Sequence, residues 1–154
     1  MSAAVQAPRA VIRRMTESDL DAVHDVERRA YDYPWSRGIL LDCLRVPYEC
    51  EVLEEGRRVV GHSVMSLAAD EAHLLNLCLA PEAQGRGLGR LLLDHVVAVA
   101  VSKAARVIFL EVRPSNARAI QLYLRAGFRR LGVRRNYYRA GTGREDALVL
   151  ARRL

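Results

Sequence analysis

Between two apolar stretches the chain reads Gln84-Gly85-Arg86-Gly87-Leu88-Gly89-Arg90, and it continues directly into the apolar run Leu91-Leu92-Leu93. The three glycines let the backbone approach a ligand closely. The apolar pattern that follows predicts a helix over residues 88–103, and the unpaired N–H groups of a helix's first turn, together with its dipole, attract anions. The stretch therefore predicts a phosphate-binding loop at the start of a helix.

Known glycine loops narrow the choice of phosphate ligand. A nucleotide-binding P-loop needs Gly-Lys followed by Ser or Thr, which Leu88-Gly89-Arg90 does not supply. A dinucleotide-binding turn is closer, because Glu111 follows about 20 residues later, where such a turn places a ribose-binding acid. The glycine spacing, however, is GxGxG instead of GxGxxG. A glycine-rich surface turn without a ligand is a further alternative.

The composition indicates one globular domain. The 154 residues are 51% hydrophobic and 27% charged, and a chain of this length most simply forms a single domain, which we predict to span residues 11–154. We expect residues 1–10 to form a disordered leader. No hydrophobic segment approaches the roughly 20 residues that cross a bilayer, so we expect no membrane partner.

The cysteines and histidines indicate neither a disulfide framework nor a metal site. Cys43, Cys50 and Cys78 form no CxxC pair and are odd in number, which favours the reducing cytoplasm. The four histidines show no metal-ligand spacing, so we expect no metal. The net charge of +6 suits an anionic ligand.

The apolar pattern predicts the order β-α-α-β-β-β-α-β-α-β-β, a mixed α/β sheet. The predicted strands are residues 11–14, 49–54, 58–66, 74–79, 107–112, 128–134 and 147–151. Helices are predicted from Thr16 to Ala30, after a cap at Ser36, from Leu88 to Lys103 and from Asn116 to Ala126.

The glycine loop also matches Gln/Arg-x-x-Gly-x-Gly/Ala, the pyrophosphate loop of the acyl-CoA-dependent N-acetyltransferases of the GNAT superfamily. A second segment, Leu110-Glu111-Val112-Arg113 followed by Ser115-Asn116-Ala117, resembles the second half of that superfamily's core. The resemblance implies a mixed, mostly antiparallel sheet with helices on both faces and a splayed central strand pair.

Two more segments resemble one branch of the superfamily, the RimI-type bacterial ribosomal-protein-alanine N-acetyltransferases. They are Tyr33-Pro34-Trp35-Ser36 and the stretch that contains Arg134-Arg135-Asn136-Tyr137-Tyr138 and Gly143-Arg144-Glu145-Asp146-Ala147. The resemblance covers nearly the whole chain, from Ile12 to Leu150. It implies an enzyme that uses acetyl-CoA as co-substrate, with direct attack of an amine in a ternary complex.

Two residues are implied as catalytic. Glu111 matches the general base, and its place in the apolar strand 107–112 would strengthen the carboxylate as a base. The alternative is a strand-end carboxylate that faces water or pairs with Arg113. Tyr123 matches the acid that protonates the departing thiolate, and the alternative is a packed helix aromatic.

The resemblance also implies the acetyl-CoA contacts. Backbone groups of the strand 74–79 would bind the pantetheine arm and polarise the thioester oxygen, which requires the strand to splay from its neighbour, often at a bulge. Asn116 would cap its helix and contact CoA. The expected cofactor-binding residues are Leu77, Cys78, Leu79, Gly85, Arg86, Gly87, Leu88, Gly89, Arg90 and Asn116.

Cys78 leaves a covalent acetyl-cysteine mechanism open as an alternative to direct attack. The sequence shows no histidine or lysine activator for its thiol. A small apolar filler is the usual role of a buried cysteine.

A protein N-terminus is the expected acceptor. A free α-amine titrates near pKa ~7.8 and a lysine near ~10.4, so unmasking lysine at neutral pH costs about 3.5 kcal/mol more. By resemblance, the acceptor is the N-terminal alanine of a small-subunit ribosomal protein, and no nucleic acid is a direct substrate. The residues expected to line the acceptor groove, with ordinary packing as their alternative, are Tyr33, Trp35, Asn136, Tyr137 and Tyr138.

Two other functions stay open. One is an acetyltransferase for a small amine such as a polyamine. The other is a catalytically silent acyl-CoA-binding module, which would have no chemical need for both Glu111 and Tyr123.

Overall fold

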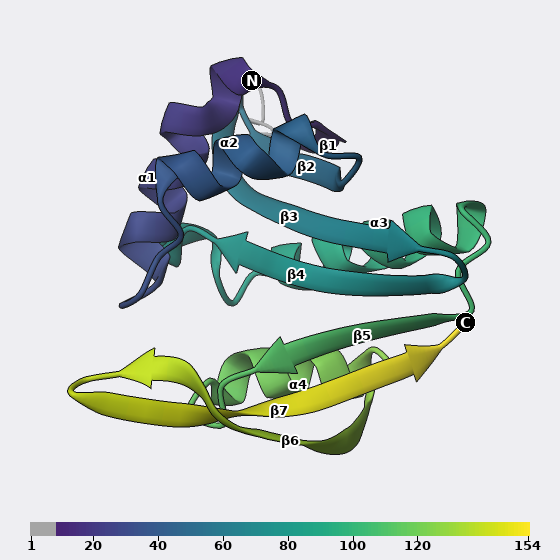
Figure 1. Ribbon diagram of the computed structural model, residues 1–154. Coiled ribbons are helices and arrows are strands. Elements are labelled where there is room, and N and C mark those ends of the chain that lie inside the picture. Colours follow the sequence, from purple (N-terminus) through teal and green to yellow (C-terminus); the bar gives the residue numbers. More distant parts are fainter. Residues whose placement is uncertain (1–8) are drawn as a thin grey trace, which may run out of the picture.

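One seven-stranded sheet, with the strand order β1-β2-β3-β4-β5-β7-β6, organises the chain (Figure 1). This computed structural model describes residues 9–154. The strands are β1 (Ala10–Arg14), β2 (Glu49–Glu55), β3 (Arg58–Ala68), β4 (Glu71–Leu79), β5 (Val107–Val112), β6 (Arg129–Ala140) and β7 (Gly143–Arg153). The helices are α1 (Leu20–Ala30), α2 (Arg37–Arg45), α3 (Leu88–Ser102) and α4 (Ala117–Arg125), with short 3₁₀ turns η1 (Glu17–Asp19) and η2 (Pro81–Ala83).

The order of elements predicted from the sequence is confirmed. Local signals explain the helix ends: the Ser36 hydroxyl accepts a hydrogen bond from the Ile39 N–H at 3.1 Å and caps α2, and Gly127 follows α4 with a φ of 92°. Of the predicted leader, residues 1–8 lie outside the described residues. Its last residue was assigned wrongly, because Ala10 already pairs with Glu55 in β1.

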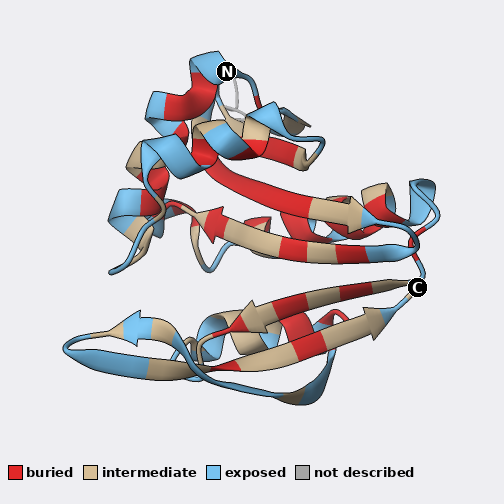
Figure 2. Cartoon of the chain, viewed as in Figure 1, coloured by how far each residue is buried: buried red, intermediate tan, exposed pale blue. Residues whose placement is uncertain are grey.

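Three strands were also predicted too short. Strand β4 begins at Glu71 instead of Leu74, and β6 and β7 run to the turn, where Ala140 pairs with Gly143. The hairpin arms between Arg134 and Ala147 are largely exposed (Figure 2). Their strand structure comes from pairing with each other, so they lack the apolar alternation that marks a half-buried strand.

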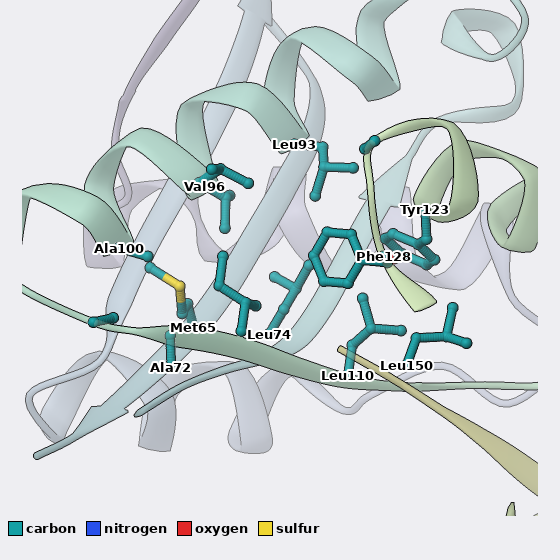
Figure 3. Close-up of a cluster of buried hydrophobic side chains, with 14 of the residues drawn as sticks. Met65, Ala72, Leu74, Leu93, Val96, Ala100, Leu110, Tyr123, Phe128 and Leu150 are labelled. Carbon is teal, nitrogen blue, oxygen red and sulfur yellow. The ribbon is translucent and has the colours of Figure 1, made fainter. Parts of the chain in front are cut away.

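Helices cover both faces of the sheet. Helices α1 and α2 pack on one face, in a core that includes Leu20, Leu40 and Val64. Helices α3 and α4 pack on the other face, in a larger core with Phe128 near its centre (Figure 3). None of the helices in the described chain meets the length and apolar character that a membrane span requires.

The central strands β4 and β5 diverge, as the predicted splayed pair requires (Figure 1). They are the parallel pair of an otherwise antiparallel sheet, and their pairing covers only Glu71–Leu74 with Val107–Leu110. Along β3, the register shifts so that Val64 pairs with Asn76 and Met65 with Leu74, which leaves Leu75 as the extra residue of a bulge. Beyond this bulge β4 follows β3 alone, and its edge toward β5 is open.

Candidate active site

A cleft of about 530 Å³ lies on the α3–α4 side of the diverging strands. Leucines of β4, the glycine loop and one face of α4 form its walls. The residues that line it are Ala30, Tyr31, Leu77, Leu79, Gln84, Gly85, Gly87, Gly89, Arg90, Asn116, Arg118, Ala119, Gln121, Leu122, Tyr123 and Arg125. Its charged lining is entirely cationic, which suits an anionic ligand.

The glycine loop presents free N–H groups to this cleft. Gly85 and Gly87 have φ values of 73° and 82°, which favour glycine, and Gly87 is the N-cap of α3. The first bond of the helix joins the Leu91 N–H to the Gly87 carbonyl at 3.1 Å, so the N–H groups of residues 88–90 have no partner within the helix. This arrangement fits a pyrophosphate, as the sequence predicted for this loop.

Replacing Gly87 by valine is expected to raise the KM for acetyl-CoA about 10-fold. A β-branched residue at this φ costs about 1–3 kcal/mol, so the loop is expected to leave the conformation that aligns its amides, and 1.4 kcal/mol corresponds to a tenfold change. The measurement is steady-state kinetics with varied acetyl-CoA. Gly141→Val, at a turn outside the cleft with a φ of 56°, should leave this KM unchanged, and an unchanged KM in Gly87→Val would contradict the role of the loop.

Not every predicted cofactor residue reaches the cleft. Arg86 turns away and pairs with Glu55 at 2.6 Å, and Leu88 packs in a buried cluster between the sheet and α1. Cys78 lies in that same cluster. The bulge at Leu75 explains why the Cys78 side chain points away from the cleft. The extra residue reverses the alternation of side chains, so that Leu77 and Leu79 face the cleft instead.

The backbone N–H and C=O groups of β4 also alternate, between its edge toward β3 and its open edge. The Ala80 N–H donates to the Val60 carbonyl of β3 at 2.8 Å, so the backbone groups of Cys78 also face β3, and those of Leu77 and Leu79 face the open edge. The carbonyls of Leu77 and Leu79 on this edge both accept hydrogen bonds from side chains. The Tyr31 hydroxyl donates to the Leu77 carbonyl at 2.8 Å, and Gln84 Nε2 donates to the Leu79 carbonyl at 3.1 Å.

Tyr123 combines two environments. Its ring packs against Phe128 in the core, with the ring centroids 5.7 Å apart (Figure 3), and the residue also lines the cleft. Burial raises the pKa of its phenol, so the hydroxyl keeps its proton at neutral pH. The two interpretations of this residue, packed aromatic and proton donor, are therefore compatible.

Glu111 lies on the opposite face of the sheet. Leu110 and Val112 point into the core beneath α3 and α4, so the side chain between them points the other way. Glu111 is also the first residue of β5 beyond its last pair with β4, Leu110 with Leu74. The carboxylate thus stands where the two strands part, with Tyr123 across the sheet.

The Glu111 carboxylate is only 7% exposed and is held by two side chains. Its Oε2 lies 2.5 Å from His73 Nε2, and its Oε1 lies 3.5 Å from Arg134 Nε. These residues line a second cleft, of about 470 Å³. The predicted alternative of a pair with Arg113 is wrong, because Arg113 instead contacts Glu145 at 3.2 Å.

Two of the five predicted acceptor residues, Tyr33 and Tyr138, lie against the same arginine. The Arg113 guanidinium lies over the rings of Tyr33, at 5.1 Å, and Tyr138, at 4.4 Å. The Tyr33 hydroxyl accepts a hydrogen bond from the Gly141 N–H, which joins the α1–α2 loop to the β6–β7 hairpin. Trp35 packs in the α1–α2 core instead.

The other two predicted acceptor residues lie on the hairpin. The Asn136 N–H donates to Asp146 at 2.9 Å. Tyr137 packs edge-on against Tyr138 and is 43% exposed. Neither the α3–α4 cleft nor the cleft at Glu111 has any of the five predicted acceptor residues in its lining.

Sequence reasoning missed several residues of these sites. Tyr31, Arg118, Gln121 and Arg125 line the cleft, and Arg118 donates to the Gln84 side chain at 3.1 Å across it. The seven-residue spacing of Arg118 and Arg125 puts them on one helix face, which is a signal that sequence analysis could have used. No comparable signal marks Tyr31.

The surroundings of Cys78 also differ from the sequence expectation. The side-chain atoms of Glu27, His62 and Cys78 that could ligate a metal ion lie within 4.8 Å of one another, and all three residues are buried. Glu27 already accepts hydrogen bonds from Asn76 and from the Trp35 N–H, and His62 Nε2 lies 3.0 Å from it. Burial raises the pKa of the Cys78 thiol strongly. A thiol that stays protonated and faces away from the cleft does not support the acetyl-cysteine alternative.

Comparison with known proteins gives a consistent result. The profile described as "Acetyltransferase (GNAT) family" matches residues 12–128. The [Ribosomal protein bS18]-alanine N-acetyltransferase of Escherichia coli (strain K12) is 36% identical over 140 residues, which is 91% of this chain and 95% of that protein. Its counterpart from Haemophilus influenzae is 34% identical over 142 residues, 92% of this chain and 97% of that protein.

Solved structures agree. The ribosomal-protein-S18-alanine N-acetyltransferase from Escherichia coli has a TM-score of 0.88 and 34% identity, with 94% of each chain covered. The PaiA N-acetyltransferase from Thermoplasma acidophilum, solved in complex with coenzyme A, has the same fold, with a TM-score of 0.79 and 17% identity over 95% of this chain and 99% of that one. The resemblance noted in the sequence is thereby confirmed, and acetyl-CoA is the co-substrate that the family uses. The chain belongs to the GNAT family of acetyltransferases.

Proposed function

We propose that this enzyme acetylates the N-terminal α-amine of a small-subunit ribosomal protein, at an alanine, in the cytoplasm. The observation that carries the proposal is the placement of Glu111 and Tyr123 on opposite sides of the point where β4 and β5 part. The relatives described above, named for this substrate, cover more than nine-tenths of the chain. The three cysteines are free thiols, which suits a reducing compartment.

In the proposed reaction, acetyl-CoA occupies the α3–α4 cleft and the acceptor amine approaches from the Glu111 face. The N–H groups of residues 88–90 bind the pyrophosphate. The N–H groups of Leu77 and Leu79, on the open edge of β4, bind the pantetheine arm and polarise the thioester carbonyl. Asn116, which caps α4 through the Ala119 N–H at 3.2 Å, lines the same cleft.

Two proton transfers accompany the attack. Glu111 takes a proton from the acceptor amine, whose nitrogen then forms a bond to the thioester carbon. The bond from that carbon to the CoA sulfur breaks, and the Tyr123 hydroxyl donates its proton to the departing thiolate. This sequence of steps requires a buried carboxylate and a buried phenol on the two faces of the sheet where β4 and β5 part.

The acceptor is tested with a peptide series. Peptides that begin with Ala, Ser, Gly or Met are compared with an N-blocked peptide that carries one internal lysine, and with spermidine. We expect the alanine peptide to be acetylated at its α-amine, and the lysine peptide about 100-fold more slowly, because the two amines differ by more than two pKa units. Mass spectrometry locates the acetyl group.

Two outcomes would contradict the proposal. Equal or faster turnover of spermidine or of the lysine peptide would assign the enzyme to another acceptor. Binding of acetyl-CoA without turnover of any amine would identify a silent acyl-CoA-binding module.

A further inference from the structure

His73 makes the shortest contact to the expected base. It lies on β4, within the short segment that pairs with β5, and its Nε2 is 2.5 Å from Glu111 Oε2. The two side chains differ in their access to water, since the imidazole is 34% exposed and the carboxylate 7%. The pair therefore joins a buried group to a group that reaches solvent.

The surroundings of His73 are those of a cleft and not of a packed core. The titratable and charged groups that line this cleft with His73 are Glu71 from β4, Glu111 from β5 and Arg134 from β6. Arg134 contacts the other carboxylate oxygen, Oε1, at 3.5 Å. A proton that arrives on buried Glu111 thus has one short hydrogen-bonded route to a partly exposed titratable group.

We propose that His73 relays the amine proton from Glu111 to water, so that the carboxylate is regenerated in each turnover. This inference rests on the proposed function, in which Glu111 is the base. In the resting pair, His73 Nε2–H donates to the Glu111 carboxylate. After Glu111 has taken the amine proton, the imidazole exchanges protons with water and changes to its Nδ1–H tautomer, which leaves Nε2 free to accept. The proton taken from the amine moves from Oε2 to Nε2, which gives a carboxylate and an imidazolium. The imidazolium then releases its Nδ1 proton to water, and the original state returns.

The chain supplies a matched control for this pair. His95 on α3 also faces a buried strand glutamate, Glu51, with exposed fractions of 36% and 8%. These values nearly equal those of His73 and Glu111, but the Nε2–Oε1 distance is 3.8 Å and neither residue lines the two clefts described above. Loss of His95 should therefore remove a histidine beside a buried glutamate without disturbing proton transfer.

The experiment compares kcat as a function of pH for the wild type, His73→Gln and His95→Gln. Glutamine keeps an amide that can donate to Glu111 but cannot carry a relayed proton. We expect kcat of His73→Gln to fall about 10- to 100-fold, with both KM values within twofold of wild type. The shape of its pH profile should also change, because the imidazole of the proton route is lost. His95→Gln should match the wild type.

A second variant separates relay from structural support. His73→Gly removes the ring, and added imidazole is expected to restore at least a tenth of the wild-type kcat in the folded variant. Two results would overturn the relay: a wild-type rate and pH profile in His73→Gln, or a loss in His73→Gly that imidazole does not relieve. Glu111→Gln distinguishes failure of the relay from failure of the proposed base. If it is inactive while His73→Gln is normal, only the relay fails, whereas an active Glu111→Gln contradicts the proposed base itself.

Discussion

Replacing Glu111 by glutamine is expected to lower kcat about 10²- to 10⁴-fold, the range typical for loss of a general base. The amide is nearly isosteric with the carboxyl group but cannot accept the amine proton. The KM for acetyl-CoA should change little, because the cleft beside α3 and α4 does not include this residue. The measurement is thiol release from acetyl-CoA with an alanine peptide between pH 6 and 9.

The pH dependence of the residual rate gives an independent check. The fraction of free α-amine rises up to and beyond its pKa of ~7.8, so Glu111→Gln should recover part of its activity as the pH increases. Glu51→Gln is the matched control, because Glu51 is also a buried strand glutamate that faces a histidine. A near wild-type rate for Glu111→Gln at neutral pH would remove this residue from the mechanism.

Replacing Tyr123 by phenylalanine is expected to lower kcat about 100-fold. The ring would still pack against Phe128 and fill the same space, whereas the proton donor for the CoA thiolate would be lost. Because burial raises the pKa of this phenol, the wild-type tyrosine stays protonated over the whole range in which the enzyme is assayed. The variant should therefore show a uniform loss of kcat at pH 6 to 9 and not a shifted pH profile.

Stability and a second tyrosine serve as controls for this variant. The free energy of unfolding should change by less than about 1 kcal/mol, since no apolar volume is removed. Tyr48→Phe, at the edge of the α1–α2 core, should retain the wild-type rate. Unchanged turnover in Tyr123→Phe would leave this residue with a packing role alone.

Features encoded in short stretches of sequence were predicted well. The spacing of Gly85, Gly87 and Gly89 indicated the loop that begins α3, Ser36 and Gly127 marked helix ends, and an apolar run marked β5. Each of these signals depends on residues within one turn of helix or a few positions of strand. Such local preferences are strong enough to survive in the folded protein.

Contacts between distant segments could not be predicted in the same way. His73 and Glu111 are 38 positions apart and meet only because β4 and β5 pair in parallel. Arg113, which follows β5, reaches the ring of Tyr33 in the α1–α2 loop, 80 positions earlier in the chain. Periodicity reports which face a residue occupies but not which strand is its neighbour, so the sequence did not indicate that His73 and Arg134 contact Glu111.

Because of the bulge at Leu75, the face of the sheet that carries even-numbered side chains at the start of β4 carries odd-numbered ones at its end. Before it, even-numbered Ala72 and Leu74 look toward α3, and after it odd-numbered Leu77 and Leu79 do. If β4 kept Leu75 but ran without the bulge, regular alternation would turn its last third inside out, with the Cys78 thiol in place of two leucines on the wall of the α3–α4 cleft. The chemistry of that wall is therefore set by the bulge as much as by the residues that follow it.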